Sequence, residues 1–177
     1  MEFIEILEKR KSCKDFSDAK VPANIIEKII KAGNLSPIGM GKPENFHLTI
    51  INNKEVLDEI DKSAAVIFKQ PDSHPLYNAP VLIVISAYDV NDRSRLTYGC
   101  TAGCIAENMM LESVNENVGS VCMTGIIRAI NDNESIFDSL MLPEGFTPIF
   151  SVALGYPANP DNTTRDFDAE KIENNYI

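Results

Sequence analysis

The sequence predicts an α/β fold of the α+β kind, in which helices flank a β-sheet, and three observations lead to this prediction. The first is size, because 177 residues of which 44% are hydrophobic can form one globular domain with a sizeable core. The second is residues 80–86, an uninterrupted apolar run typical of a central strand that is covered on both faces. The third is the alternation along the chain of helical apolar spacing with shorter stretches typical of strands.

The first half of the chain predicts two helices, a strand and a third helix. Residues 2–9 carry apolar side chains at helical spacing. A second helix begins at Pro22, buries a stripe of isoleucines and ends where Gly33 can take the position after the last turn. Residues 46–51 alternate as a strand does, and a helix follows the turn after them. Residues 64–79 fit no single pattern.

The second half predicts a long buried helix between strands. Residues 94–117 contain no proline and are apolar on more than one side. Small residues recur in this helix at spacings of three and four, on a face that can meet either its own core or the backbone of a second subunit: Gly99, Ala102, Gly103 and Ala106. Residues 119–125 predict a short strand that ends at a glycine before another helix, and residues 149–154 predict the last strand.

The charge balance narrows the class of partner. The chain has 26 Asp and Glu against 16 Lys and Arg, a formal net charge of -10, and no basic stripe that could bind nucleic acid or an anionic membrane. No apolar run approaches the roughly 20 residues that a membrane span needs, and the first residues do not resemble a secretion signal. We therefore expect a cytoplasmic protein that acts on small molecules.

The cysteines and histidines do not predict a metal site. The four cysteines form no Cys-x-x-Cys pair, and His47 and His74 are far apart in the sequence. Cys100 and Cys104 are one helical turn apart, but two thiols alone make no iron–sulfur site. We expect reduced thiols and no bound metal.

Residues 10–16 concentrate positive charge in a chain that is acidic overall. Arg10, Lys11 and Lys14 lie within five positions, together with the hydroxyl of Ser12. Like charges this close repel, so they are either neutralised by nearby carboxylates or held for an anion. Arginine offers a planar fork and lysine a point charge to phosphate oxygens. The cluster therefore indicates either a phosphate site or a basic surface turn at the end of the preceding helix.

Two further stretches have the chemistry of a cofactor site. Residues 34–45 contain two prolines and two glycines, which predict a long irregular loop of the kind that a compact domain keeps for a function. This loop is not a nucleotide P-loop, because Pro43 follows Lys42 where that motif needs a hydroxyl residue. Residues 119–125 would leave backbone N–H groups free for a polar cofactor edge.

These pieces, in this order, resemble the nitroreductase family of FMN-dependent oxidoreductases. Residues 10–16 are similar to its Arg-Arg-Ser-x-Arg-x-Phe motif, and residues 35–43 to its Ala-Pro-Ser-x-x-Asn-x-Gln-Pro loop. Residues 79–86, the long helix ending at residues 119–120, and residues 154–157 complete the resemblance. It implies a homodimer with a three-layer fold, in which helices flank a central mixed, mostly antiparallel sheet. Residues 1–177 would form one FMN-binding domain, with residues 155–177 as an extension packing on the partner subunit.

The resemblance also implies an FMN site at the subunit interface. In it Arg10, with Lys11 beside it, and Arg165 would hold the phosphate, and Ser12 and Lys14 would reach the ribityl chain and the pyrimidine edge. Lys14 would also stabilise the reduced flavin, whose negative charge lies near N1 and O2. Backbone groups near the flavin N5 would come from Met123, Thr124 and Gly125. The other subunit would contribute Pro37, Ile38, Gly39, Met40 and Lys42.

The implied activity is transfer of hydride from NAD(P)H to a nitroaromatic, quinone or similar small-molecule acceptor by a ping-pong route. The chemistry would be carried by the flavin N5 rather than by a side chain. Met40, Lys42 and Glu44 stand where the family usually has Asn, Gln and an aromatic residue. The alternative is therefore a flavin-binding protein without reductase turnover, or a homologue that has lost FMN.

Overall fold

The structure is a computed structural model that describes residues 2–159, 172, 173 and 175, so Arg165 lies outside the described residues. The helices are α1 (Phe3–Lys9), α2 (Ala23–Asn34), α3 (Lys54–Ile67), α4 (Arg95–Asn115), α5 (Ile127–Asn131) and α6 (Glu134–Ser139). The strands are β1 (Phe46–Ile51), β2 (Val81–Tyr88), β3 (Gly119–Cys122) and β4 (Phe146–Gly155). Two short 3-10 turns, η1 (Gly39–Gly41) and η2 (Pro43–Asn45), lie between α2 and β1.

The four strands form one sheet in the order β1-β2-β4-β3. Each neighbouring pair is antiparallel, with Ile83 of β2 opposite Ile50 on one side and Val152 on the other. In the described part of the chain, parallel pairing is limited to an isolated bridge between Ser12 and Ser120. The antiparallel character that we expected is therefore confirmed, and the mixed character is reduced to this bridge.

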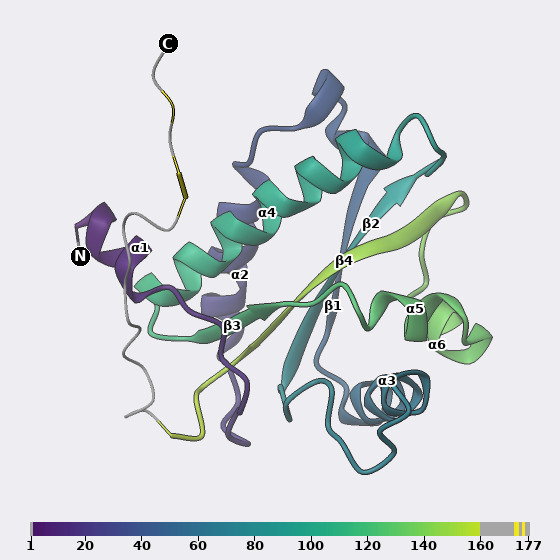
Figure 1. Cartoon of the computed structure of the whole chain (residues 1–177), viewed down its shortest axis with the longest axis horizontal. Coiled ribbons are helices and arrows are strands. Elements are labelled where there is room, and N and C mark those ends of the chain that lie inside the picture. The colour runs from purple at the N-terminus through teal and green to yellow at the C-terminus, as the bar shows by residue number, and fades with distance from the viewer. Residues whose placement is uncertain (1, 160–171, 174, 176–177) are drawn as a thin grey trace.

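The sheet is the middle layer of three (Figure 1). Helices α2 and α4 cover one face, and α3, α5 and α6 cover the other. Side chains of β2 alternate between the layers, since Ile83 and Ile85 pack toward α2 and α4 while Leu82 and Val84 pack toward α3. All four are 0% exposed, because a strand covered on both faces has no solvent side.

Two predicted element ends are wrong. Helix α2 continues to Asn34, so Gly33 lies in its last turn rather than after it. A Cβ at Gly33 would come within 2.5 Å of Met109 Cε, which indicates that this glycine permits the close approach of α2 to α4. Strand β3 ends at Cys122 rather than at residue 125, because pairing with β4 stops there.

The four small residues predicted to share one face of α4 lie in two different environments. Ala102 and Ala106 are 0% and 1% exposed and belong to the core against the sheet. A Cβ at Gly99 or Gly103 would meet no atom of another described element within 4 Å. Only the two glycines therefore remain open to another chain.

Residues 10–16 follow the edge of the sheet at β3 (Figure 1). The N–H of Cys13 donates to the Ser120 carbonyl at 2.9 Å, and the N–H of Phe16 donates to the Tyr77 carbonyl at 3.0 Å. The Phe16 ring is 3% exposed. With Cys13 and Phe16 held in this way, the segment presents Ser12 and Lys14 on its outer side, where both are exposed.

Candidate functional site

A pocket of about 520 Å³, which we call the edge pocket, lies where three segments meet beside β3. Ser12 and Lys14 line it from the N-terminal segment, and residues 121–126 line it from the end of β3 and the following turn. The third side is the chain after α3, from Phe68 to Tyr77. A Cβ at Gly125 would lie 3.0 Å from Phe68 Cζ, tighter than most Cβ contacts, so the glycine of the turn leaves room for the Phe68 ring.

The edge pocket holds a set of hydrogen-bond donors that the protein itself does not use. Within the described part of the chain, the N–H groups of Thr124 and Gly125 make no hydrogen bond, nor do the side chains of Ser12 and Lys14. Residue 123 is fixed on both sides, since its N–H donates to the Ser151 carbonyl at 2.8 Å and its carbonyl accepts from the Ser151 hydroxyl at 2.6 Å. These donors suit a ligand rich in acceptors, such as a phosphorylated heteroaromatic cofactor.

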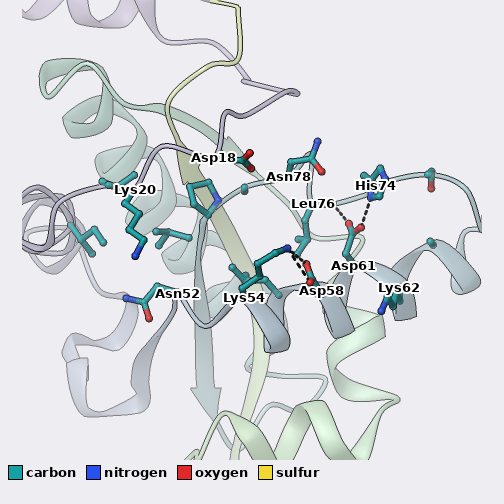
Figure 2. Close-up of a pocket in the computed structure, with 18 of the residues that line it drawn as sticks. Asp18, Lys20, Asn52, Lys54, Asp58, Asp61, Lys62, His74, Leu76 and Asn78 are labelled. Carbon is teal, nitrogen blue, oxygen red and sulfur yellow. Dashed lines mark hydrogen bonds and ion pairs between the residues drawn. The ribbon is translucent and has the colours of Figure 1, made fainter.

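A second space of about 880 Å³, which we call the large cavity, lies on the other side of the chain that follows α3 (Figure 2). In this view Lys54 faces Asp58, and Asp61 faces His74. The Nζ of Lys54 lies 2.9 and 3.0 Å from the two Asp58 oxygens, and this hydrogen bonding raises the pKa of Lys54. Ser73 and His74 line both spaces and so form the boundary between them.

Five residues that the sequence singled out therefore gather at one place. They are Ser12, Lys14, Met123, Thr124 and Gly125, and all of them line the edge pocket. Although about 110 residues separate the two groups, pairing of the N-terminal segment with β3 brings them together.

The remaining cations of the cluster lie outside the edge pocket. The Arg10 Nε lies 3.5 Å from a carboxylate oxygen of Glu107 on α4, and the Arg10 side chain is 20% exposed. Lys11 is half-buried and does not line the pocket. Neutralisation by a carboxylate, one of the two readings of the cluster, thus applies to Arg10 in this chain.

The loop predicted to come from a second subunit lies against the first half of α4. The N–H of Gly39 donates to Thr101 Oγ1 at 3.0 Å, and the Ser36 hydroxyl donates to the Cys104 carbonyl at 3.2 Å. Met40 has a positive φ of 62° and is 61% exposed. Residues 37–42 do not line the edge pocket of their own chain.

Sequence reasoning missed the side of the edge pocket formed after α3. Phe68, Gln70 and His74 line it, but residues 64–79 gave no periodicity because turns occupy most of the segment after Ile67. The one available signal was that His74 is one of only two histidines in the chain.

The described residues contain no group of three or more His, Cys, Asp or Glu side chains that could hold a metal ion. Among the helices of that same part of the chain, none combines the length and the apolar character needed to cross a membrane.

The cysteines provide a chemical test of the edge pocket. Burial raises the pKa of the Cys13 thiol, which donates to the Asp15 carbonyl at 3.2 Å, so Cys13 stays in the unreactive thiol form to higher pH. Cys122 is exposed and lines the edge pocket. In native protein at pH 8, iodoacetamide followed by peptide mass spectrometry should modify Cys122 but not Cys13. A pocket ligand should protect Cys122, and labelling of Cys13 as fast as Cys122 would contradict the burial.

The chain is thus an α+β protein of three layers with a donor-lined pocket at the edge of its sheet. The model of the nitroreductase family matches residues 7–156. The chain therefore belongs to the nitroreductase family.

Relatives and solved structures agree with this assignment. A protein of Methanothermobacter thermautotrophicus named "Putative NADH dehydrogenase/NAD(P)H nitroreductase" is 25% identical over 176 residues, covering 97% of this chain and 86% of its own length. An FMN-bound nitroreductase from Bacteroides fragilis has a TM-score of 0.81 and 24% identity, and covers 99% of this chain and 100% of that chain. An FMN-bound nitroreductase from Desulfitobacterium hafniense has a TM-score of 0.83 and 20% identity, over 100% and 99% of the two chains. These two similarities show a shared fold.

Proposed function

We propose that this protein is an FMN-dependent oxidoreductase that uses the edge pocket as its flavin site. The observation that carries the proposal is the unused donor set of that pocket: Ser12, Lys14 and the N–H groups of Thr124 and Gly125. Two nitroreductases of the same fold have FMN bound. The donors fit this cofactor, whose ring edge and ribityl chain carry acceptors. When bound, the flavin would supply hydride transfer.

The residues of the chain have distinct tasks in this proposal. Lys14 would place an ammonium near the charge that develops on the reduced ring, and Ser12 would hold a ribityl or ring oxygen. Backbone N–H groups at residues 124 and 125 would orient the ring edge without a flexible side chain. Arg10 would hold the phosphate together with Arg165, and to do so it would turn from or share its contact with Glu107.

We further propose that two copies of the chain complete the site. Phe3 and Ile4 of α1 are 66% and 58% exposed, and Leu96 of α4 is 78% exposed, so both helices offer apolar side chains that a partner could cover. Gly99 and Gly103 lie open on α4, which both α1 and the loop containing Met40 contact. A second subunit on this face would bury these side chains and bring residues 37–42 to an edge pocket that lacks them.

Gly103→Arg should therefore convert a dimer to a monomer and weaken FMN binding while the fold is kept. The reason is that a Cβ added at Gly103 meets no atom of another described element within 4 Å, whereas the side chain would block the approach of another backbone. Light scattering and circular dichroism would measure mass and fold. Val66→Arg, at a 70% exposed site on α3, is the matched control. A wild-type monomer that retains FMN would contradict the proposal.

The reductant proposed is NAD(P)H, and the acceptor a quinone, nitroaromatic or similar small molecule, with the two substrates reacting in turn at one flavin. The name of the archaeal relative supports the reductant. Purified protein should be yellow and should bleach anaerobically with NADH or NADPH. Yellow protein that does not bleach would support the alternative of a flavin-binding protein without turnover. Colourless protein that cannot be reconstituted with FMN would refute both.

A further inference from the structure

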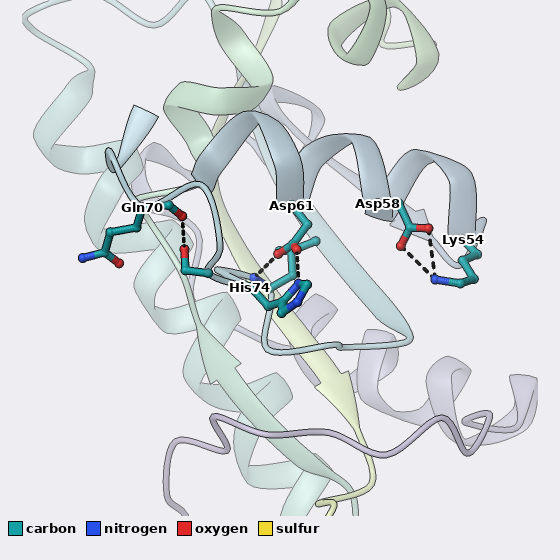
Figure 3. Close-up of polar contacts among 7 residues, drawn as sticks. Lys54, Asp58, Asp61, Gln70 and His74 are labelled. Atoms are coloured by element: carbon teal, nitrogen blue, oxygen red, sulfur yellow. Dashed lines mark hydrogen bonds and ion pairs between the residues drawn. The ribbon is translucent and has the colours of Figure 1, made fainter. Parts of the chain in front are cut away.

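An imidazole and a carboxylate form a fixed pair beside the edge pocket (Figure 3). Asp61 lies on α3, with one oxygen 2.9 Å from His74 Nδ1 and the other accepting the Leu76 N–H at 2.7 Å. A carboxylate can only accept, so the proton between the two side chains is carried by Nδ1. The Asp61 side chain is 16% exposed and is held by a backbone group, which makes it a stiff support for the ring.

The pair leaves the second ring nitrogen available. Nε2 of His74 makes no hydrogen bond to any described residue, and the His74 side chain is 66% exposed. Because His74 lines both the edge pocket and the large cavity, it lies between the proposed flavin site and the large cavity. A ring with a fixed tautomer at such a boundary can take a proton from one side and give it to the other.

Charged groups of both signs line the two spaces that His74 separates. Besides Asp61, the groups that line the two spaces are Lys14, Asp18, Lys20, Lys54, Asp58 and Lys62. The two linings together contain four lysines and, with Asp61, three aspartates, and Lys54 and Asp58 are paired with each other. Among the described residues, Asp61 is the one hydrogen-bond partner of the His74 ring.

We propose that His74, positioned by Asp61, supplies the proton that an acceptor needs when it receives hydride at the edge pocket; this rests on the proposed function. Reduction of a quinone to a hydroquinone takes two electrons and two protons. The hydride carries both electrons and one proton, and the imidazolium of His74 gives the other. The O–H bond of the product forms as the N–H bond at Nε2 breaks, and the neutral ring regains a proton from water in the large cavity.

The first test observes the imidazole ring of His74 directly by NMR. The chain has only two histidines, so proton NMR of the imidazole C2–H groups gives two resonances, which His74→Gln assigns. His47, whose ring lies 5.9 Å from that of Phe146, is the internal control, because it lines neither of the two spaces. Adding FMN to the apoprotein should shift the His74 resonance and its pH titration and leave His47 unchanged. Bound FMN with no effect on His74 would overturn the inference, whereas absence of FMN binding would overturn the proposed function.

The second test separates proton supply from structural support. His74→Gln should slow reoxidation of the reduced protein by benzoquinone about 100-fold and remove its pH dependence, as expected for loss of a general acid. Reoxidation by ferricyanide, a one-electron acceptor that takes up no proton, should stay at the wild-type rate, and so should reduction by NADH. Asp61→Asn keeps an oxygen for the Leu76 N–H and should slow the quinone reaction about 10-fold.

His47→Gln is the matched control and should leave both acceptors unaffected. An equal loss of rate with benzoquinone and ferricyanide in His74→Gln would mean that the pair only holds the chain after α3 in place. An unchanged benzoquinone rate would mean that the proton comes from elsewhere. Either result overturns the inference, and neither bears on whether the protein binds FMN or accepts electrons from NADH.

Discussion

Lys14→Met is expected to bind FMN about 10- to 150-fold more weakly than the wild type, which corresponds to about 1.5–3 kcal/mol for a charge-assisted hydrogen bond. Lys14 is exposed, lines the edge pocket and makes no hydrogen bond to the described residues, so its removal takes away a ligand contact without breaking a contact of the fold. Quenching of flavin fluorescence during titration of the apoprotein would give the dissociation constants.

The reduction potential of the bound flavin should fall in the same variant, because the ammonium favours the negatively charged reduced form. Lys31→Met removes a cation from the exposed side of α2 and is the matched control, since it lies outside the edge pocket and the large cavity. Unchanged affinity and potential in Lys14→Met would show that the flavin does not lie in the edge pocket.

Ile83→Ala is expected to lower the free energy of unfolding by about 2–5 kcal/mol, the usual range for truncating a buried isoleucine. Ile83 is 0% exposed at the centre of the sheet and packs in the layer formed with α2 and α4. The cavity that is left cannot collapse easily, because strands pair with β2 on both sides. Urea denaturation of the wild-type and variant apoproteins, both at the same protein concentration, would measure the change.

Ile50→Ala is the matched control, because Ile50 lies directly opposite Ile83 in the sheet but is 38% exposed. Its truncation should cost clearly less, about 1 kcal/mol or below, since part of the side chain already contacts water. Equal losses in the two variants would contradict the central position of β2 in the core.

The fold was predictable because its signals are local. The apolar run at residues 80–86 is typical of a strand covered on both faces, and β2 is that strand, with every residue from Val81 to Ala87 buried. The ends of elements were less predictable. From the sequence alone, Gly33 could either end a helix or allow a neighbouring helix to pack closely against it. Only the position of Met109 on α4 decides between these roles.

Two of the three sides of the candidate site could be predicted from the sequence. Ser12 and Lys14 belong to the cationic cluster near the start of the chain. Residues 123–125 were indicated by a predicted strand that ends at a glycine before a helix, and by the family resemblance. The structure places both groups at the edge pocket. The third side of that pocket was not predictable, because Asp61 and His74 are 13 residues apart and no periodic pattern connects them. Their pairing depends on turns after α3, where Lys69, Tyr77 and Asn78 all have positive φ.

By itself the sequence determined that the chain alternates helices and strands around a doubly covered strand, and that its cations concentrate near the start, because spacing and charge are properties of neighbouring residues. Only the tertiary structure decided that the N-terminal segment pairs with β3, that Arg10 meets Glu107, and that His74 is held by Asp61 between two cavities. The physical reason is that such contacts join residues far apart in the chain, and their geometry exists only once the layers have packed.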